Sequence, residues 1–256
     1  MMEYNKIYNE NCLDTMARME DNFIDLTVTS PPYDNLRTYN GYSFDFEPIA
    51  RELYRVTKEG GVVVWVVGDA TIKGSETGTS FKQALYFKEC GFNLHDTMIY
   101  QKSTPPLTHN RYEQNFEYMF VFSKGKPNTF NGLREPKEYK DSRKNKAFGK
   151  NKDDSIDFGY SKQTATRLKR NVWKYFAGGG ANDKIASKHP AIFPEQLAND
   201  HIISWSNEGD IVYDCFMGSG TTAKMALLNN RRYIGSELSA EYVEIIKERL
   251  SQVKLF

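Results

Sequence analysis

The run Val62-Val63-Val64-Trp65-Val66-Val67 constrains the fold of this 256-residue chain more than any other segment. Six consecutive apolar residues, five of them β-branched, favour a strand that is buried on both faces. Strands of this kind are typical of parallel sheets covered by helices on both sides. The sequence therefore predicts a central strand at residues 62–67 in a layered α/β fold.

Strands and helices are expected to alternate along the rest of the chain. Strands are predicted at residues 5–8, 24–29, 94–101, 117–122, 210–213 and 232–235. Helices are predicted at residues 13–19, 48–58, 80–89, 195–204 and 241–253, with one more carrying Ala223, Ala226 and Leu227. Gly60-Gly61 is expected to stop the helix at 48–58, and the strands at 94–101 and 117–122 are expected to form an antiparallel edge. This alternation favours an α/β fold, with an open, mostly parallel twisted sheet and helices on both faces.

A glycine-rich turn lies between the strand at 210–213 and the following helix. Its sequence is Asp214-Cys215-Phe216-Met217-Gly218-Ser219-Gly220-Thr221-Thr222. Such a turn brings backbone N–H groups close to a ligand. The P-loop lysine is absent, and the third glycine of a dinucleotide fingerprint is missing. Glu237 follows Gly218 by 19 residues, a spacing at which an acid can hold a ribose. The pattern predicts a nucleoside-containing ligand, although a glycine turn and a surface glutamate can also coincide.

A second short motif follows the predicted strand at 24–29. Thr29-Ser30-Pro31-Pro32-Tyr33 places a hydroxyl before two prolines and an aromatic ring after them. Since neither proline donates a backbone N–H, nearby carbonyls are left to accept hydrogen bonds. Acceptors on one wall and a stacking face on the other suit a planar ring with an amino group. A simple turn is the alternative reading.

Together these motifs resemble the DNA amino-methyltransferases that use S-adenosylmethionine, in the permuted group whose catalytic motif precedes the cofactor motif. Besides the two motifs, the blocks at residues 9–14 and 188–194 and the acid segment at 235–238 follow the family order. The resemblance implies a Rossmann-like methyltransferase fold. The family usually has Gly-Asp where this chain has Glu10-Asn11, and often proline where Cys215 stands.

The resemblance also implies the roles of individual residues. Catalytic roles are expected for Ser30, Pro31, Pro32 and Tyr33. Binding of S-adenosylmethionine is expected for Asn11, Cys12, Thr29, His189, Pro190, Asp214, Phe216, Gly218, Ser219, Gly220, Thr221, Thr222, Glu237 and Leu238. Asp69, at the end of the central strand, is a lesser candidate that could equally be a capping residue.

In the resembling family, serine at the start of the catalytic tetrapeptide is typical of cytosine-N4 enzymes and aspartate of adenine-N6 enzymes. Ser30 therefore favours transfer to the N4 of a cytosine flipped out of duplex DNA. Adenine-N6 methylation is the alternative. A catalytically inactive DNA-binding relative is a third hypothesis, which the intact motifs disfavour.

Composition excludes several other classes of protein. No run of 18 apolar residues exists, and the N-terminal residues contain no signal-peptide core. Three cysteines are too few for a disulfide framework, and neither they nor the four histidines have metal-ligand spacing, so no metal is expected. The sequence predicts a cytoplasmic protein of bacterial, archaeal or phage origin without a membrane partner.

The net charge of +1 hides a basic segment. Residues 124–174 hold 15 Lys and Arg against 6 Asp and Glu, a net +9 that leaves −8 for the rest of the chain. This is the charge pattern of a nucleic-acid partner, although a solvated loop would have similar composition. We expect a target-recognition insertion at 124–174, partly irregular, between the catalytic half (1–123) and the cofactor half (175–256) of one core. DNA contact is expected for Arg143, Lys144, Lys169 and Arg170. Double-stranded DNA is the expected partner; a homodimer and a cognate restriction endonuclease are left open.

Overall fold

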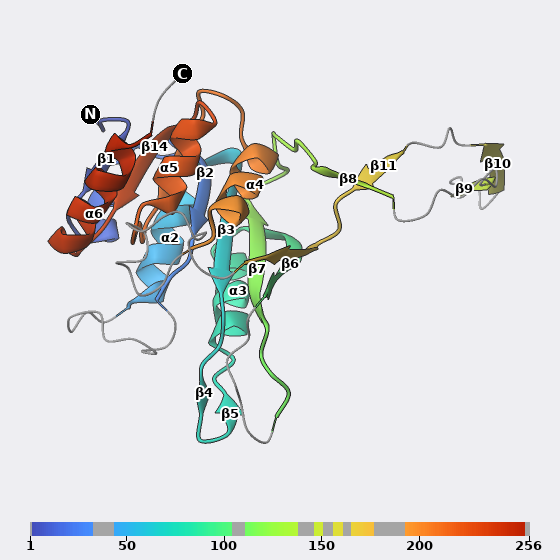
Figure 1. Cartoon of the computed structure of the whole chain (residues 1–256), viewed down its shortest axis with the longest axis horizontal. Coiled ribbons are helices and arrows are strands. Elements are labelled where there is room, and N and C mark those ends of the chain that lie inside the picture. The colour runs from blue at the N-terminus through green and yellow to red at the C-terminus, as the bar shows by residue number, and fades with distance from the viewer. Residues whose placement is uncertain are drawn as a thin grey trace. The chain divides into compact units, whose positions relative to one another are not determined.

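A computed structural model describes residues 2–32, 44–103, 111–137, 165–176 and 193–253, together with two strands at 146–150 and 156–160. The chain divides into two compact units (Figure 1). The larger unit comprises residues 1–131 and 171–256, and the smaller is Gly132–Arg170. The smaller unit lies within the segment expected to be the insertion, whereas residues 124–131 and 171–174 belong to the larger unit.

The described residues of the larger unit form an eight-stranded sheet in the order β1-β14-β13-β2-β3-β7-β6-β12. These strands are β1 (Lys6–Tyr8), β14 (Arg232–Ser236), β13 (Ile211–Asp214), β2 (Ile24–Thr29), β3 (Thr57–Val67), β7 (Phe116–Ser123), β6 (Asn93–Lys102) and β12 (Val172–Tyr175). Strand β7 pairs antiparallel with both neighbours, and the other pairs are parallel. The predicted open, mostly parallel sheet is confirmed.

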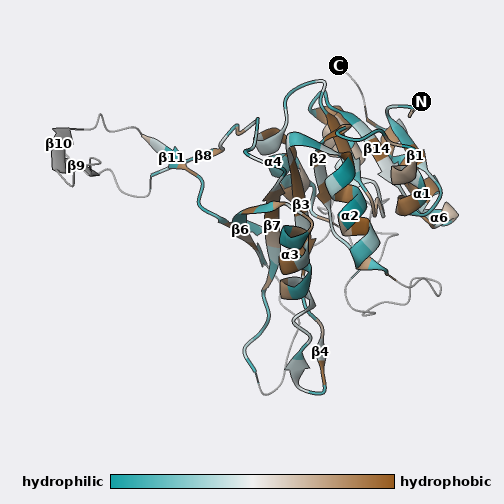
Figure 2. Ribbon diagram, turned by 180° about the vertical axis from the view of Figure 1, so that it is seen from behind, coloured by the Kyte–Doolittle hydropathy of each residue, from teal (hydrophilic) through white to brown (hydrophobic). Residues whose placement is uncertain are grey.

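Helices cover both faces of this sheet, as the opposite views show (Figures 1 and 2). One set comprises α1 (Cys12–Ala17), α2 (Phe46–Val56) and α3 (Thr79–Glu89). The other comprises α4 (Glu195–Trp205), α5 (Thr221–Leu228) and α6 (Ala240–Ser251). A short hairpin of β4 (Thr71–Ile72) and β5 (Ser75–Glu76) follows the end of β3. No helix in the described part of the chain is long and apolar enough to cross a lipid bilayer.

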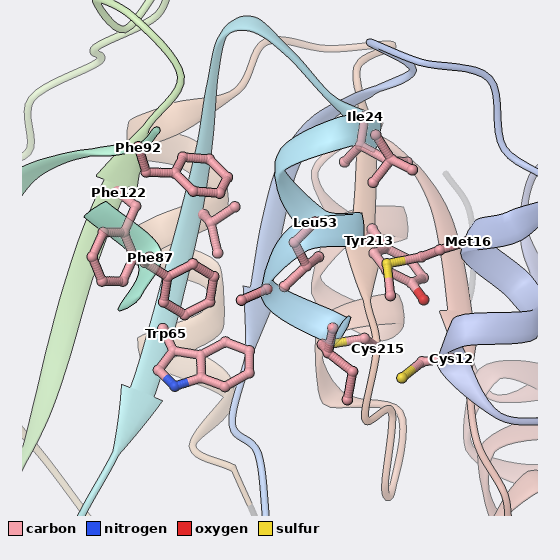
Figure 3. Close-up of a cluster of buried hydrophobic side chains, with 14 of the residues drawn as sticks. Cys12, Met16, Ile24, Leu53, Trp65, Phe87, Phe92, Phe122, Tyr213 and Cys215 are labelled. Atoms are coloured by element: carbon pink, nitrogen blue, oxygen red, sulfur yellow. The ribbon is translucent and has the colours of Figure 1, made fainter. Parts of the chain in front are cut away.

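The core lies along the central strands β2 and β3, where Figure 2 shows apolar residues concentrated. Every residue from Val62 to Val67 is buried. Trp65 packs against Phe87 at a ring-centroid distance of 5.1 Å, and Phe87 packs against Phe122 at 4.6 Å (Figure 3). Burying each such ring contributes about 1.5–3 kcal/mol, so this cluster fixes α3 against the sheet and gives the strand ends a rigid base.

Two local predictions are wrong. Helix α2 ends at Val56, and Gly60 and Gly61 lie inside β3. Along β2, the partner residue moves from Thr57 for Ile24 to Val62 for Leu26, so the glycines occupy an irregular excursion of β3. Gly60 has a φ of +78°, and a Cβ there would lie 2.2 Å from the Asn128 side chain. Glycine is therefore needed for the bulge rather than as a helix stop.

The predicted antiparallel pair β6–β7 is confirmed, but it does not form the edge of the sheet. Strand β12, whose first three residues lie in the segment expected to be the insertion, pairs parallel with β6 and takes that place. Its two buried rings, Trp173 and Tyr175, alternate with exposed neighbours, so they attach this short strand to the core.

The smaller unit contains short antiparallel pairs in the segment that was expected to be partly irregular. Strand β8 (Arg134–Pro136) pairs with β11 (Thr166–Leu168), and β9 (Lys146–Lys150) pairs with β10 (Ile156–Tyr160). Arg167 reinforces the first pair through a 2.8 Å hydrogen bond to Glu135. Two-stranded ladders bury little surface, which explains why the sequence carries no strong periodic signal there.

Candidate active site

Three of the predicted site residues lie at the carboxyl ends of three neighbouring parallel strands. Thr29 ends β2, Asp214 ends β13, and Glu237 follows Ser236 at the end of β14. Since β13 pairs with both β2 and β14, these ends lie side by side. Ligands of open α/β sheets bind at this edge, so the topology brings together motifs that are about 200 residues apart in sequence.

A buried hydrogen bond joins the two motifs directly. Thr29 Oγ1 donates to Asp214 Oδ1 at 2.6 Å, and the backbone N–H of Phe216 donates to the same oxygen at 3.0 Å. Burial raises the pKa of Asp214, while its bonds with Thr29, Phe216 and Thr222 act in the opposite direction. Asp214 therefore organises the start of the glycine turn and locks it to the end of β2.

The glycine turn depends on backbone conformations that other residues rarely adopt. Gly218 has a φ of +53° and Gly220 a φ of +80°. A Cβ on Gly220 would lie 2.8 Å from Cγ2 of Ile246 in α6. Gly220 is also the N-cap of α5, and its N–H donates to the Met217 carbonyl at 2.8 Å. Gly220 is therefore required for the close packing of the turn against α6, independently of any ligand, and glycine suits the left-handed backbone at Gly218.

The hydroxyl residues of the turn point into the protein interior. Ser219, Thr221 and Thr222 are each at most 4% exposed. Thr222 Oγ1 donates to the Val28 carbonyl at 3.2 Å. Ser219 and Thr221 both accept hydrogen bonds from Arg249, a residue that the sequence interpretation missed. The side chains of these three predicted cofactor residues thus shape the turn from within.

Glu237 is held at the mouth of the same turn. Its Oε2 accepts from the Gly218 N–H at 2.8 Å, and its Oε1 accepts from the Ser239 N–H at 2.9 Å. Burial raises the pKa of the Glu237 carboxyl, and the two backbone bonds partly offset that increase. Asn9 fixes the next segment by donating to the carbonyls of Glu237 and Leu238 at 2.8 and 2.9 Å. Leu238 itself is 47% exposed.

Asn11 and Cys12 lie at the start of α1, which follows β1 along the chain. Asn11 is the N-cap of this helix, and its Oδ1 accepts from the Leu13 N–H at 2.9 Å. Cys12 is buried, and burial raises the pKa of its thiol to about 12. Burial likewise raises the pKa of Cys215 well above its ordinary value. Both thiols are therefore neutral packing groups in the core (Figure 3).

The catalytic motif is described as far as Pro32. Ser30 and Pro32 are partly buried and Pro31 is buried, directly after the end of β2. Tyr33 lies outside the described residues, as do His189, Pro190, Arg143 and Lys144. Lys169 and Arg170 lie in the smaller unit, where Lys169 donates its backbone N–H to Leu133 at 2.8 Å.

Asp69, the lesser candidate at the end of the central strand, has a structural role, and so does the partly buried Phe46 at the start of α2. Asp69 accepts from the N–H and hydroxyl of Ser80 at 2.8 and 2.5 Å, so it caps the first turn of α3. Phe46 packs against Trp65 and Phe87 in the core. Among the described residues, no group of three His, Cys, Asp or Glu side chains could hold a metal ion.

Comparison with known proteins identifies the family. The N6/N4 methyltransferase family model, described as DNA methylase, matches residues 24–248. The orphan methyltransferase M.BamHII of Bacillus amyloliquefaciens is 62% identical over 234 residues, which cover 89% of this chain and 88% of that protein. The chain belongs to the N6/N4 DNA methylase family. This confirms the resemblance drawn from the motifs, and the protein is a DNA methyltransferase.

Solved structures of other methyltransferases share the fold. PvuII DNA methyltransferase, described as cytosine-N4-specific, aligns with a TM-score of 0.73 at 19% identity, covering 99% of this chain and 89% of that one. M1.HpyAVI, solved as a complex with SAM, aligns with a TM-score of 0.62 at 22% identity, covering 96% of this chain and 99% of that one. The Rossmann-like methyltransferase fold is thereby confirmed.

Proposed function

We propose that this DNA methyltransferase transfers a methyl group from S-adenosyl-L-methionine to the exocyclic N4 of a cytosine flipped out of duplex DNA. The observation that carries the proposal is the Thr29–Asp214 hydrogen bond of 2.6 Å. It fixes the catalytic motif beside the glycine turn. The strand that follows this turn in sequence is β14, and Glu237 comes directly after it. Cofactor side and base side thus share one rigid edge of the sheet.

The residues at this edge fit a nucleoside-containing cofactor. A carboxylate offers about four acceptor sites, so the two backbone bonds to Glu237 leave acceptor capacity for ribose hydroxyls. Gly218, whose N–H binds that carboxylate, places no side chain beside it. The bound SAM of M1.HpyAVI, which has the same fold, supports this assignment. S-adenosyl-L-methionine supplies an electrophilic methyl group on a positively charged sulfur.

The base side requires acceptors for an amino group. The lone pair of the cytosine N4 is delocalised into the ring, which makes this nitrogen a poor nucleophile. We assign Ser30 Oγ and the Pro31 carbonyl to accept its two hydrogens, so that the lone pair turns out of conjugation, and Tyr33 to stack on the base. Burial of Pro31 and partial burial of Ser30 support a fixed position for these acceptors. Most of the rate gain would come from positioning, a contribution of up to roughly 7–11 kcal/mol in well-oriented systems.

Cytosine is favoured over adenine because the tetrapeptide begins with Ser30. That a protein of this fold is described as cytosine-N4-specific supports the choice. Digestion of DNA methylated by the purified enzyme, followed by nucleoside mass spectrometry, tests it. We expect N4-methylcytosine; N6-methyladenine in its place would assign the enzyme to the alternative substrate, and no methylated nucleoside would favour an inactive relative.

The basic segment is proposed to contact the DNA. The net +9 of residues 124–174, which include the smaller unit, supports binding to phosphates. M.BamHII is named as an orphan methyltransferase, which favours a solitary enzyme over one that is paired with a restriction endonuclease. Methylation that protects the host DNA should then be found in cells that carry no companion nuclease gene.

A further inference from the structure

A buried arginine of the last helix contacts the glycine turn. Arg249, in α6, is only 2% exposed. Its Nη1 donates to the Ser219 carbonyl and to Thr221 Oγ1, both at 2.9 Å. Its Nη2 forms an ion pair with Glu195, the first residue of α4. One guanidinium group therefore joins α6, the glycine turn and the beginning of α4.

Glu195 also binds Lys224, so Glu195, Lys224 and Arg249 form one charged cluster. Lys224 Nζ donates to the same Glu195 oxygen at 2.6 Å, so one carboxylate oxygen holds two cations. Burying an ion pair costs several kcal/mol of solvation per ion, and a well-packed apolar side chain often stabilises a fold equally well. Stability alone is therefore a weak reason for a guanidinium at this position.

The groups that Arg249 binds point to another role. Ser219 lies between Gly218, whose N–H binds Glu237, and Gly220, which is the N-cap of α5. The planar guanidinium fork holds acceptors in fixed relative directions, which a lysine ammonium does not. The Ser219 carbonyl lies two peptide units after the Gly218 N–H, so releasing this carbonyl would loosen the segment that presents the N–H to Glu237.

We propose that Arg249, oriented by Glu195, is a positioning residue of the cofactor site. It holds the glycine turn in the conformation that keeps Glu237 in place for S-adenosyl-L-methionine. This inference rests on the proposed function, because it assigns the turn and Glu237 to that cofactor.

Arg231 provides a matched control, because it joins α4 and α5 at the ends opposite to the glycine turn. Arg231 donates to the carbonyls of Ser206 and Asn229, both at 2.6 Å. Ser206 is the C-cap of α4, and Asn229 is the C-cap of α5. Arg231 thus joins α4 to α5 as Arg249 does, but at the ends opposite to the glycine turn.

The experiment compares Arg249→Met, Arg249→Lys and Arg231→Met. Calorimetric titration with S-adenosyl-L-methionine is done below the melting temperature of each protein, alongside KM values for the cofactor and for duplex DNA. Arg249→Met should raise the cofactor Kd by roughly 10- to 100-fold, as expected when charge-assisted hydrogen bonds are removed. Its KM for DNA should stay unchanged. Arg249→Lys should recover part of the affinity, and Arg231→Met should lower the melting temperature without altering the Kd.

A folded Arg249→Met protein with wild-type cofactor affinity would overturn the inference. So would an equal loss of affinity in Arg231→Met, since the effect would then be general loosening of the helices. If Arg249→Met does not fold, Arg249→Lys carries the comparison, and an unchanged Kd there has the same meaning. Failure of the wild-type enzyme itself to bind S-adenosyl-L-methionine would instead overturn the proposed function, and this inference with it.

Discussion

Replacing Glu237 with glutamine tests the cofactor half of the site with little change in side-chain volume. The carboxylate accepts one backbone N–H on each oxygen, from Gly218 and Ser239. Glutamine keeps one acceptor oxygen but turns an NH2 group toward the other N–H. The substitution thus removes the charge and one of the two backbone hydrogen bonds to this side chain.

The expected loss follows from the bonds at this carboxylate. Charge-assisted hydrogen bonds contribute about 1.5–3 kcal/mol, so the Kd for S-adenosyl-L-methionine should rise roughly 10- to 100-fold in Glu237→Gln. Calorimetry on the folded variant measures this Kd. Glu244→Gln in the exposed Lys247–Glu244 pair on α6 is a suitable control, because that pair lies on the surface. Wild-type affinity in Glu237→Gln would refute the ribose assignment.

The raised pKa of Glu237 determines the direction in which cofactor affinity and fold stability change with pH. Burial raises the Glu237 pKa above the ordinary value of 4.5. Cofactor affinity should therefore fall as the pH is lowered through this raised pKa, because the protonated carboxyl loses its charge. The stability of the cofactor-free fold should change in the opposite direction, since a carboxyl whose pKa is raised on folding contributes stability at low pH that is lost as the pH increases. In Glu237→Gln, the part of the pH dependence of affinity and of stability that arises from Glu237 should disappear. The part that arises from Asp214, whose pKa is also raised by burial, should remain.

Further substitutions test the bond between the two motifs, the acceptor for the target amino group and the contact with DNA. Thr29→Val removes the buried donor to Asp214; it should cost about 1.5–3 kcal/mol, a decrease of roughly 3–12 °C in Tm, and an unchanged melting curve would show that the bond does not stabilise the fold. Ser30→Ala should leave the cofactor Kd unchanged and reduce turnover by about 2–4 kcal/mol in activation free energy, by analogy with other positioned polar groups; wild-type kcat would remove Ser30 from the mechanism. Neutralising the basic residues of the insertion should weaken DNA binding and reduce the log–log salt slope by about 0.9 for each DNA phosphate that the protein no longer neutralises, and an unaltered slope would place the DNA on another face; the residues to change are Arg143, Lys144, Lys169 and Arg170.

The sequence predicted the sheet because its signals are local. The apolar run Val62–Val67 and the glycine turn each act through neighbours in the chain, so period and turn chemistry were sufficient. The predicted junction of α2 and β3 was wrong because a glycine pair can either end a helix or form a β-bulge. Gly60 serves a bulge whose partner, Asn128, lies far away in sequence.

In the site as well, residues marked by local motifs were predicted, and residues that act through distant contacts were missed. The motifs located Asp214 and Glu237, and parallel pairing brought them to one edge of the sheet. The sequence did not indicate Arg249, because a basic residue in the last turn of a helix is ordinary. Its partners lie 28 to 54 residues earlier in the chain. It also did not show that the hydroxyls of Ser219 and Thr222 face inward, since exposure depends on tertiary packing.

We infer that one edge of the sheet has a cofactor half and a base half. Single-turnover methylation of duplex DNA, measured against cofactor concentration for wild type, Glu237→Gln and Ser30→Ala, tests this most directly. We expect saturating S-adenosyl-L-methionine to restore Glu237→Gln to nearly the wild-type rate and to leave Ser30→Ala slow at every concentration. Rescue of Ser30→Ala by cofactor, with Glu237→Gln slow even at saturation, would contradict the assignment of the two halves.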